Sequence, residues 1–400
     1  MIVRLTRPAA AAAGAALALL LAVIPLAAES RTSVKVSSYA AGYANGNDGL
    51  DLTGLATARL SIKSTGSRDV KGEFSLDSTT ASLGTGGPPL LDIYRAFVQT
   101  DFPALRLTLG KARLSWGDGI YFNAGDRLYG STSLTPGLTS SVFRDEARWL
   151  AAAYLPFGMF SFVEAVALPP DFIVPIMTET PPWPNPDAEY YDITHTDAGL
   201  RIVTEAVNTK FEAGYLYNYR DDEAGGTEAG GVHEPYVSLQ GYLLLDWHLS
   251  AAARINPSDP KESFRENLEI TAGVAHSFYP QGAPTIGLRL EGLIRPGRDW
   301  EATSYASAEA AQAALATSPG YGLFLYPEVS LSGGSAALIV NGLYSPVDNS
   351  GMASLLGQWK IYQGLTLLGA FSFQAGEGGD LFGWNRRGGQ SLTLGAEYVF

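Results

Sequence analysis

The chain has 400 residues, and its 40 Asp and Glu against 27 Lys and Arg give a net charge of −13 at pH 7. This acidic balance excludes a nucleic-acid-binding protein, because phosphate contacts need clustered Lys and Arg side chains. The absence of Cys excludes a lipoprotein acylated on cysteine and a secreted domain held together by disulfides. It fits a chain that crosses an oxidising compartment, where thiols would mispair.

The N-terminal segment has the anatomy of a secretory signal peptide. Arg4 and Arg7 precede the apolar run 8–26, and small residues follow it, so that cleavage is expected after Ala28 or Ser30. A retained membrane anchor is the alternative, but the run is dominated by small Ala side chains. No other segment has the ~20 consecutive apolar residues of a spanning helix. The sequence therefore predicts an exported protein.

The rest of the chain alternates apolar and polar side chains, as β-strands do. In one segment Phe211, Ala213 and Tyr215 alternate with Lys210 and Glu212. No amphipathic helix of framework length and no interdomain linker interrupts the pattern. The alternation predicts about eighteen strands, with sixteen as the other possible count, at residues 31–44, 50–64, 68–79, 90–100, 105–115, 139–155, 158–168, 193–206, 208–220, 234–245, 247–256, 265–278, 284–295, 322–332, 335–344, 351–360, 363–374 and 389–400.

The lengths of the connections distinguish between two all-β folds. Every second connection is tight, whereas most of the intervening ones are longer, at 116–138, 169–192, 221–233, 296–321 and 375–388. A soluble β-sandwich has no reason to keep its long loops at one end. A transmembrane barrel does so, with short periplasmic turns and long external loops. We therefore expect a signal peptide at 1–28 and a single antiparallel transmembrane β-barrel at 29–400, in which the last strand pairs with the first.

The C-terminal residues carry a resemblance that supports this fold. Thr393, Gly395, Tyr398 and Phe400 resemble the polar-x-Gly-x-x-aromatic-x-aromatic signal by which outer-membrane β-barrels are recognised for assembly. An ordinary C-terminal edge strand would show the same alternation. The resemblance implies the outer membrane of a diderm bacterium as the location. It also implies outer-membrane lipid, the barrel assembly machinery and periplasmic chaperones as partners.

The strand predicted at 105–115 contains an irregularity. Leu107 and Leu109 share one face, but Lys111 and Arg113 fall on the same parity. Lipid would not accommodate these cations. Either the register shifts at Gly110, where a bulge is most easily accommodated, or the strand has already left the membrane.

The following segment shows a second resemblance, to a pattern found near the middle of several porin-like outer-membrane families. That pattern reads G-[K/R]-x…W-G-x-G…N-x-x-D, and it is matched by residues 110–126, although Ala124 and Gly125 stand where the related pattern often has Pro. The resemblance implies that loop 116–138 folds inward and constricts a pore. A well-ordered external turn rich in Gly and Asx residues is the alternative.

Charged residues on the polar faces are the candidates for lining or constricting a pore. An eighteen-stranded barrel is wide enough for an aqueous channel, and rows of opposite charge across it select solutes by charge and dipole. Cross-strand ion pairs that only stiffen the wall are the competing interpretation. The candidates are Lys111, Arg113, Asp118, Asp126, Arg127, Arg144, Glu146, Arg148, Asp197, Arg201, Glu205, Arg289 and Glu291.

Catalytic motifs are missing from the sequence. The four His residues lie outside any H-E-x-x-H motif, and no G-x-S-x-G elbow, metal-ligand cluster or phosphate-binding loop occurs. We therefore expect no enzyme, no cofactor and no metal. The expected function is a porin-type channel for passive diffusion of small polar solutes or ions. A surface barrel that acts as an adhesin or structural protein through its loops is the main alternative, and an outer-membrane hydrolase is a weaker one. The oligomeric state stays open, a homo-oligomer included.

Overall fold

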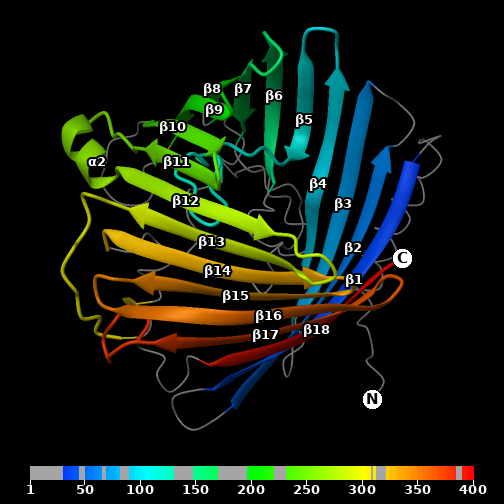
Figure 1. Ribbon diagram of the computed structural model, residues 1–400. Coiled ribbons are helices and arrows are strands. Elements are labelled where there is room, and N and C mark those ends of the chain that lie inside the picture. The colour runs from blue at the N-terminus through cyan, green and yellow to red at the C-terminus, as the bar shows by residue number, and fades with distance from the viewer. Residues whose placement is uncertain are drawn as a thin grey trace, which may run out of the picture.

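The computed structural model describes residues 30–44, 50–64, 69–81, 90–129, 147–169, 196–219, 231–307, 310–311, 321–383 and 390–400. In this part of the chain, eighteen strands form one antiparallel sheet that closes on itself (Figure 1). Closure joins β1 (Ser30–Ala44) to β18 (Ser391–Val399), in a register that runs from Lys35↔Val399 to Tyr43↔Ser391. The predicted all-β barrel of eighteen strands is confirmed, and so is the pairing of its last strand with its first.

The strands follow one another around the barrel in chain order, each paired with its predecessor and its successor. Most of their bounds lie close to those that the alternation predicts; the strand predicted at 139–155 is observed from Arg148 to Pro156, and positions 139–146 lie outside the described residues. The remaining strands are β2 (Leu50–Ser64), β3 (Val70–Ala81), β4 (Leu90–Asp101), β5 (Arg106–Ala112), β6 (Arg148–Pro156), β7 (Phe162–Leu168), β8 (Asp197–Ala206), β9 (Thr209–Asn218), β10 (Val232–Tyr242), β11 (Asp246–Ala252), β12 (Glu269–Phe278), β13 (Thr285–Ile294), β14 (Leu323–Gly333), β15 (Ala336–Ser345), β16 (Ser350–Tyr362) and β17 (Leu365–Ala375).

The two faces of each strand have opposite character. On β13, Leu288 and Leu290 are 42% and 48% exposed, whereas Glu291 on the opposite face is 1% exposed. Apolar side chains thus cover the outside of the barrel, and polar side chains point into it. A transmembrane barrel has this arrangement, with its apolar face toward lipid.

The connections divide the barrel into a short-turn end and a long-loop end. At the short-turn end β8 and β9 are joined by Val207 and Asn208 alone, both with positive φ, as in a two-residue hairpin turn. At the long-loop end, 113–147 and 295–322 connect their strands. This alternation agrees with the predicted pattern of tight and long connections.

Helix α2 (Pro260–Glu266) lies in the connection between β11 and β12, where the sequence predicts only a loop. Its start is nonetheless encoded locally, since Asp259 caps the backbone N–H of Glu262 and Pro260 occupies the first turn. The described helices include none that is long and apolar enough to cross a membrane.

Strand β5 keeps its register past Gly110, so the predicted register shift does not occur. Its pairing with β4 and β6 is unbroken up to Lys111 and Ala112. Gly110 instead has a φ of +119°, and a Cβ atom there would lie 2.1 Å from the backbone oxygen of Ala96. Only glycine fits this close approach of the two backbones. Lys111 thus stays on the same face as Leu109, one residue before the end of β5, and its ammonium pairs with the carboxylate of Asp92 at 3.1 Å.

Candidate functional site

The segment that follows β5 runs inside the barrel. We call residues 113–129 the inner loop. Trp116 and Phe122 are 0% exposed in it, and Asn123 and Asp126 are at most 2% exposed. Its polar contacts reach inward-facing side chains on strands from β7 to β13. Such a loop narrows the interior, because it occupies space between opposite walls.

The first anchor of the inner loop is Glu212 on β9, which is 3% exposed. Its Oε1 atom accepts hydrogen bonds from the backbone N–H of Gly117 at 2.8 Å and from the Tyr236 hydroxyl at 2.6 Å. Arg201 and Lys210 form ion pairs with the same carboxylate at 3.2 and 3.0 Å. Glu212 thus fastens the start of the loop to three neighbouring strands.

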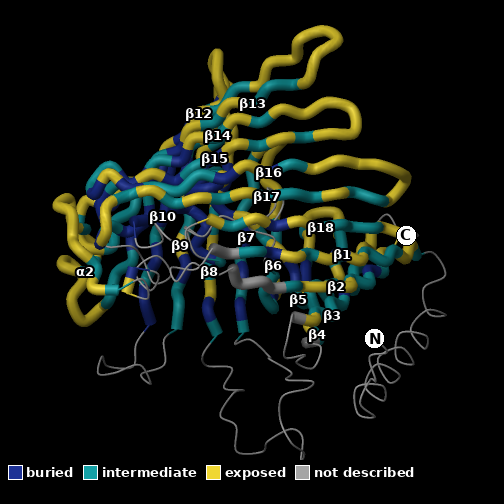
Figure 2. The backbone as a smooth tube through the Cα atoms, turned by 90° about the horizontal axis from the view of Figure 1, so that it is seen from below, coloured by how far each residue is buried: buried dark blue, intermediate teal, exposed yellow. Residues whose placement is uncertain are grey.

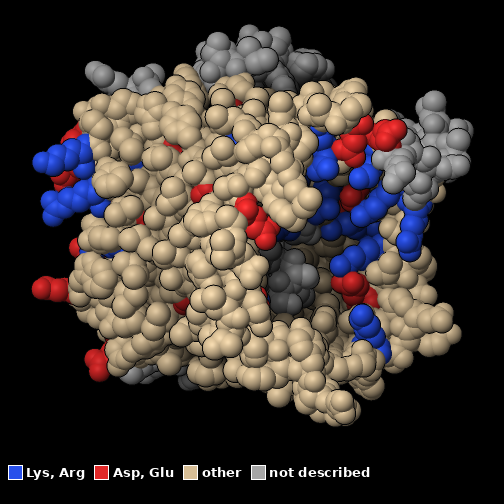
Figure 3. Space-filling view, turned by 45° about the horizontal axis from the view of Figure 1, so that its top comes forward, with Lys and Arg blue, Asp and Glu red and all other residues tan. Residues whose placement is uncertain are grey.

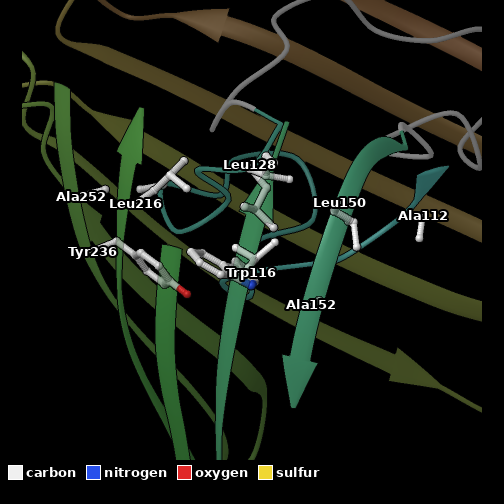
Figure 4. Packing of buried hydrophobic residues seen from close by; sticks show 11 residues of the cluster. Ala112, Trp116, Leu128, Leu150, Ala152, Leu216, Tyr236 and Ala252 are labelled. Atoms are coloured by element: carbon white, nitrogen blue, oxygen red, sulfur yellow. The ribbon is translucent and has the colours of Figure 1, made fainter. Parts of the chain in front are cut away.

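Trp116 fixes the same part of the loop by packing. Its indole Nε1 donates to Glu164 on β7 at 3.0 Å, and its ring stacks on Tyr236 with centroids 5.7 Å apart. Figure 4 shows this pair among the apolar side chains of the surrounding strands. The wall makes room for the indole at Gly199, where a Cβ atom would lie 2.6 Å from the Trp116 ring.

The second anchor is Glu291 on β13. One oxygen of this carboxylate accepts from the backbone N–H groups of Tyr121 and Phe122 at 2.9 and 2.7 Å. Beside it, Ala124 N–H donates to the Thr271 hydroxyl at 3.3 Å. The Tyr121 ring stacks on Tyr326 of β14, with centroids 3.8 Å apart. Burial, and to a lesser degree the Glu291 carboxylate, raises the pKa of the Tyr121 phenol, so the phenol stays neutral.

The third anchor is a chain of five charged side chains at the long-loop end. Arg127 of the inner loop pairs with Glu234 of β10 at 2.7 Å and with Glu269 of β12 at 3.3 Å. Arg254 pairs with Glu234 at 2.9 Å, and Arg295 pairs with Glu269 at 2.6 Å. The Arg127 and Glu234 side chains are 4% and 1% exposed. Removing one partner of a buried ion pair is strongly destabilising, because it leaves the other charge buried and uncompensated.

The charge balance of this chain predicts unequal effects of two substitutions. Glu234→Gln removes the carboxylate that pairs with both Arg127 and Arg254, and we expect it to lower the free energy of unfolding by about 3–5 kcal/mol. Arg127→Met leaves two complete ion pairs, so its effect should be smaller. Urea unfolding of the refolded barrel in detergent measures both. Asp101→Asn, which weakens an exposed pair with Arg106, is the control and should cost about 1 kcal/mol or less. Equal losses for the first two variants would contradict the charge argument.

The motif residues of the inner loop hold its own conformation. Asn123 Nδ2 donates to the backbone oxygen of Trp116 at 2.9 Å, and its Oδ1 accepts from the Gly125 N–H at 3.1 Å. Gly117 has a φ of +68°, and a Cβ atom there would lie 2.2 Å from Asn123 Oδ1. The spacing of Trp, Gly and Asn is therefore a requirement of a closed turn.

Several predicted site residues lie where they hold the inner loop. Asp118 pairs with Lys210 at 2.6 Å and accepts from Ser238. Arg148 donates to the backbone oxygen of Leu128 and pairs with Asp197 at 3.2 Å. The same role falls to Arg127, Arg201 and Glu291, described above.

The other predicted residues are more scattered. Arg289 pairs with Glu328 at 2.9 Å, next to Glu291. Asp126 is buried in the inner loop, whereas Arg113 is exposed at its start and Glu205 is exposed at the short-turn end of β8. Arg144 and Glu146 lie outside the described residues, as do positions 130–138 of the predicted constriction loop.

Sequence reasoning missed the wall carboxylates that receive the loop. Glu164, Glu212, Glu234 and Glu269 were absent from the candidates, although each interrupts a strand of mostly apolar or small residues. A single acidic residue among apolar or small neighbours was the feature of the sequence that could have identified these positions. It marks an inward position but does not identify the partner.

The interior beside β1–β4 has a different character. Lys35 pairs with Glu397 at 2.7 Å, and Lys63 pairs with Glu73 at 3.4 Å. These lysine side chains are 41% and 54% exposed, although they share strand faces with buried inward serines. Figure 3 shows Lys and Arg side chains along one side of a hollow, on the side where Figure 1 places β1–β4. Farther from the short-turn end, the inward side chains of Arg59 and Arg95 are still 26% and 23% exposed, so water reaches this part of the interior.

Comparisons with known proteins agree on the architecture. No protein-family model matches the sequence, and no curated protein sequence is significantly similar to it. Among solved structures, Acinetobacter baumannii OccAB4 is similar with a TM-score of 0.53 and 9% identity, over 93% of this chain and 98% of that chain. Pseudomonas putida OprB gives 0.49 and 11%, over 95% and 96%. A variant of Rh. blastica porin gives 0.44 and 9%, over 93% and 100%. The likeness to OccAB4 concerns the fold alone. The fold is therefore a closed antiparallel β-barrel of eighteen strands, similar to that of OccAB4.

Proposed function

We propose that the protein is a passive diffusion channel for small polar solutes or ions, with the inner loop as its constriction. The observation that carries the proposal is the combination of a loop fixed inside the barrel with charged, water-accessible side chains beside it. The loop contacts β7–β14 and leaves the interior beside β1–β4 lined by Lys35, Lys63 and their partners. A narrowed but hydrated passage with fixed charges selects solutes by size and charge.

The proposal includes the path of the protein to its membrane. Residues 1–28 direct export and are removed, and the C-terminal strand is read by the assembly machinery in the outer membrane. The short-turn end then faces the periplasm and the long-loop end faces outward. These assignments rest on the basic and apolar N-terminal segment and on the closing aromatic residues of the chain.

Planar-bilayer recording of the refolded protein tests the channel. We expect discrete single-channel steps, and we expect Lys63→Glu to shift the reversal potential in a salt gradient toward cation selectivity. Lys261→Glu is the matched control, because Lys261 is exposed on α2 at the long-loop end, so that a change of the same charge there should leave selectivity unchanged. A barrel that is folded by heat-modifiable gel mobility yet gives no steps would overturn the proposal.

A further inference from the structure

A second connection also enters the barrel from the long-loop end. We call residues 376–383, which follow β17, the β17–β18 tip. A tight turn forms it, with backbone bonds from Asp380 N–H to Glu377 O and from Gly383 N–H to Asp380 O, both at 3.1 Å. Leu381 and Phe382 stand at the end of this turn and are at most 2% exposed.

The wall holds the tip through its backbone. Leu381 N–H donates to Asp348 Oδ2 at 2.8 Å, and Phe382 N–H donates to the Ser350 hydroxyl at 3.2 Å. A third bond, at 2.9 Å, runs from the N–H of Tyr305, in the connection after β13, to the backbone oxygen of Gly379. The tip is thus fastened to the start of β16 and to a neighbouring connection.

The tip and the inner loop meet in one apolar cluster, which we call the septum. All nine of its core side chains are at most 2% exposed, and they come from the inner loop, from β13, β14 and β15, from the connection before β14 and from the tip. The residues are Tyr121, Phe122, Leu293, Tyr321, Phe324, Tyr326, Leu343, Leu381 and Phe382.

The septum separates two kinds of interior. Beneath it, the inward hydroxyls of Ser345 and Ser350 are at most 1% exposed. On β2 and β4 the inward side chains of Arg59 and Arg95 are 26% and 23% exposed in the middle of the barrel, and Lys35 and Lys63 are 41% and 54% exposed toward its short-turn end. In Figure 2 the buried positions are likewise denser on β7–β15 than on β1–β4. A closely packed apolar layer excludes water, and moving an ion through it without hydrogen-bonding partners is strongly unfavourable.

We infer that the β17–β18 tip is a second constriction element, and that the septum it forms with the inner loop confines permeation to the side of β1–β4. Leu381 and Phe382 then set the size of the passage together with Tyr121 and Phe122. Permeating solutes pass Lys35 and Lys63 and do not pass Ser345. This inference rests on the proposed channel function and adds to it the route through the barrel.

Single cysteines can report this route, because the natural chain contains none. We would place one at Lys63→Cys or at Ser345→Cys and treat the refolded proteins with a small cationic methanethiosulfonate reagent. Mass spectrometry should show Lys63→Cys reacting at least about tenfold faster, since a covered position reacts only through rare openings. In bilayers, the reagent should change the conductance of Lys63→Cys and leave that of Ser345→Cys unchanged.

Removing the septum side chains should open the covered side. We expect Leu381→Ser with Phe382→Ser to raise the single-channel conductance and to speed the labelling of Ser345→Cys by about tenfold. Met159→Ser, at a short turn where this side chain is 88% exposed, is the matched control and should change neither.

The outcomes separate this inference from the proposed function. Equal labelling of the two single-cysteine proteins overturns the inference even if the double serine variant fails to fold, because that comparison needs only the natural septum. A folded double serine variant with unchanged conductance and unchanged labelling also overturns it. Unequal labelling in a barrel that never conducts supports the septum while refuting the channel.

Discussion

Replacing residues 117–126 with a short Gly–Ser segment should raise the single-channel conductance by a factor of about two and shift the ion selectivity toward anions. The first effect follows from the space that the inner loop occupies, because conductance grows with the open cross-section. The loop's larger side chains, among them Tyr121 and Phe122, are packed against the wall at most 2% exposed. When these side chains are removed, water fills the space that they occupied, and the open cross-section of the lumen increases.

The selectivity change follows from the two carboxylates that the replacement removes, because residues 117–126 include Asp118 and Asp126 but neither Lys nor Arg. Glu212 and Glu291 accept backbone N–H groups of Gly117, Tyr121 and Phe122. Without the loop these carboxylates face water, which solvates them, so the barrel should still fold. Glu212 keeps its ion pairs with Arg201 and Lys210, whereas Lys210 loses Asp118. The passage therefore becomes more positive and attracts anions.

The control for this variant is the same Gly–Ser segment placed at the exposed turn 279–284, between β12 and β13. It should leave both conductance and reversal potential unchanged. Heat-modifiable gel mobility verifies that both barrels are folded. An unchanged conductance and reversal potential in the variant lacking 117–126 would refute a constricting role for the inner loop.

The barrel itself could be predicted from the sequence because its determinants are local. Alternation such as Leu288, Leu290 against Arg289, Glu291 marks a strand with one face toward lipid. The tight turns mark every second connection. The partner of the last strand could also be predicted, because a closed antiparallel barrel with an even number of strands in chain order pairs its last strand with its first. Local rules failed at Gly110, where a close backbone contact requires glycine and no register shift occurs, and they did not predict helix α2.

The site could be predicted only in part, because its contacts join distant segments. The WGxG pattern predicts that the loop after β5 folds inward, but Tyr121 meets Glu291 across 170 residues and Lys210 meets Asp118 across 92. Alternation shows that Glu291 points inward. It cannot show whether water or a backbone N–H satisfies that carboxylate, because the answer depends on where the loop crosses the lumen.

The septum was still less accessible from sequence. Leu381 and Phe382 stand in a Gly-rich connection that reads as an external loop. Their burial depends on Tyr326, Phe324 and the other inward aromatic side chains of β14 and its neighbours. A pattern of period two treats an inward aromatic side chain as an exception to the polar face. In this barrel such exceptions mark the places where a loop packs against the wall.

Deleting Tyr398–Phe400 should abolish assembly in the outer membrane while leaving export across the inner membrane intact. The deletion removes little of the seam, because β18 pairs with β1 from Lys35↔Val399 as far as Tyr43↔Ser391. It does remove the aromatic pair of Tyr398 and Phe400, whose rings lie 4.4 Å apart, and Phe400 is 73% exposed at the end of the outward face. An exposed aromatic pair contributes little to the folded barrel and is available to a partner.

Assembly in cells and refolding in detergent should therefore respond differently to this truncation. The purified truncated chain should refold, since most of the β1–β18 and β17–β18 pairing remains, whereas in cells it should accumulate in the periplasm with its signal peptide removed. Val399→Ser, on the alternate face of the same strand, is the matched control and should assemble normally. Cell fractionation with heat-modifiable gel mobility measures the outcome. If the truncated chain reached the outer membrane at normal levels, the terminal residues would be an ordinary strand end. If it neither assembled in cells nor refolded in detergent, these residues would instead stabilise the seam. They would do so through the hydrogen bonds from Phe400 N–H to Val34 O and from Val399 N–H to Gly364 O.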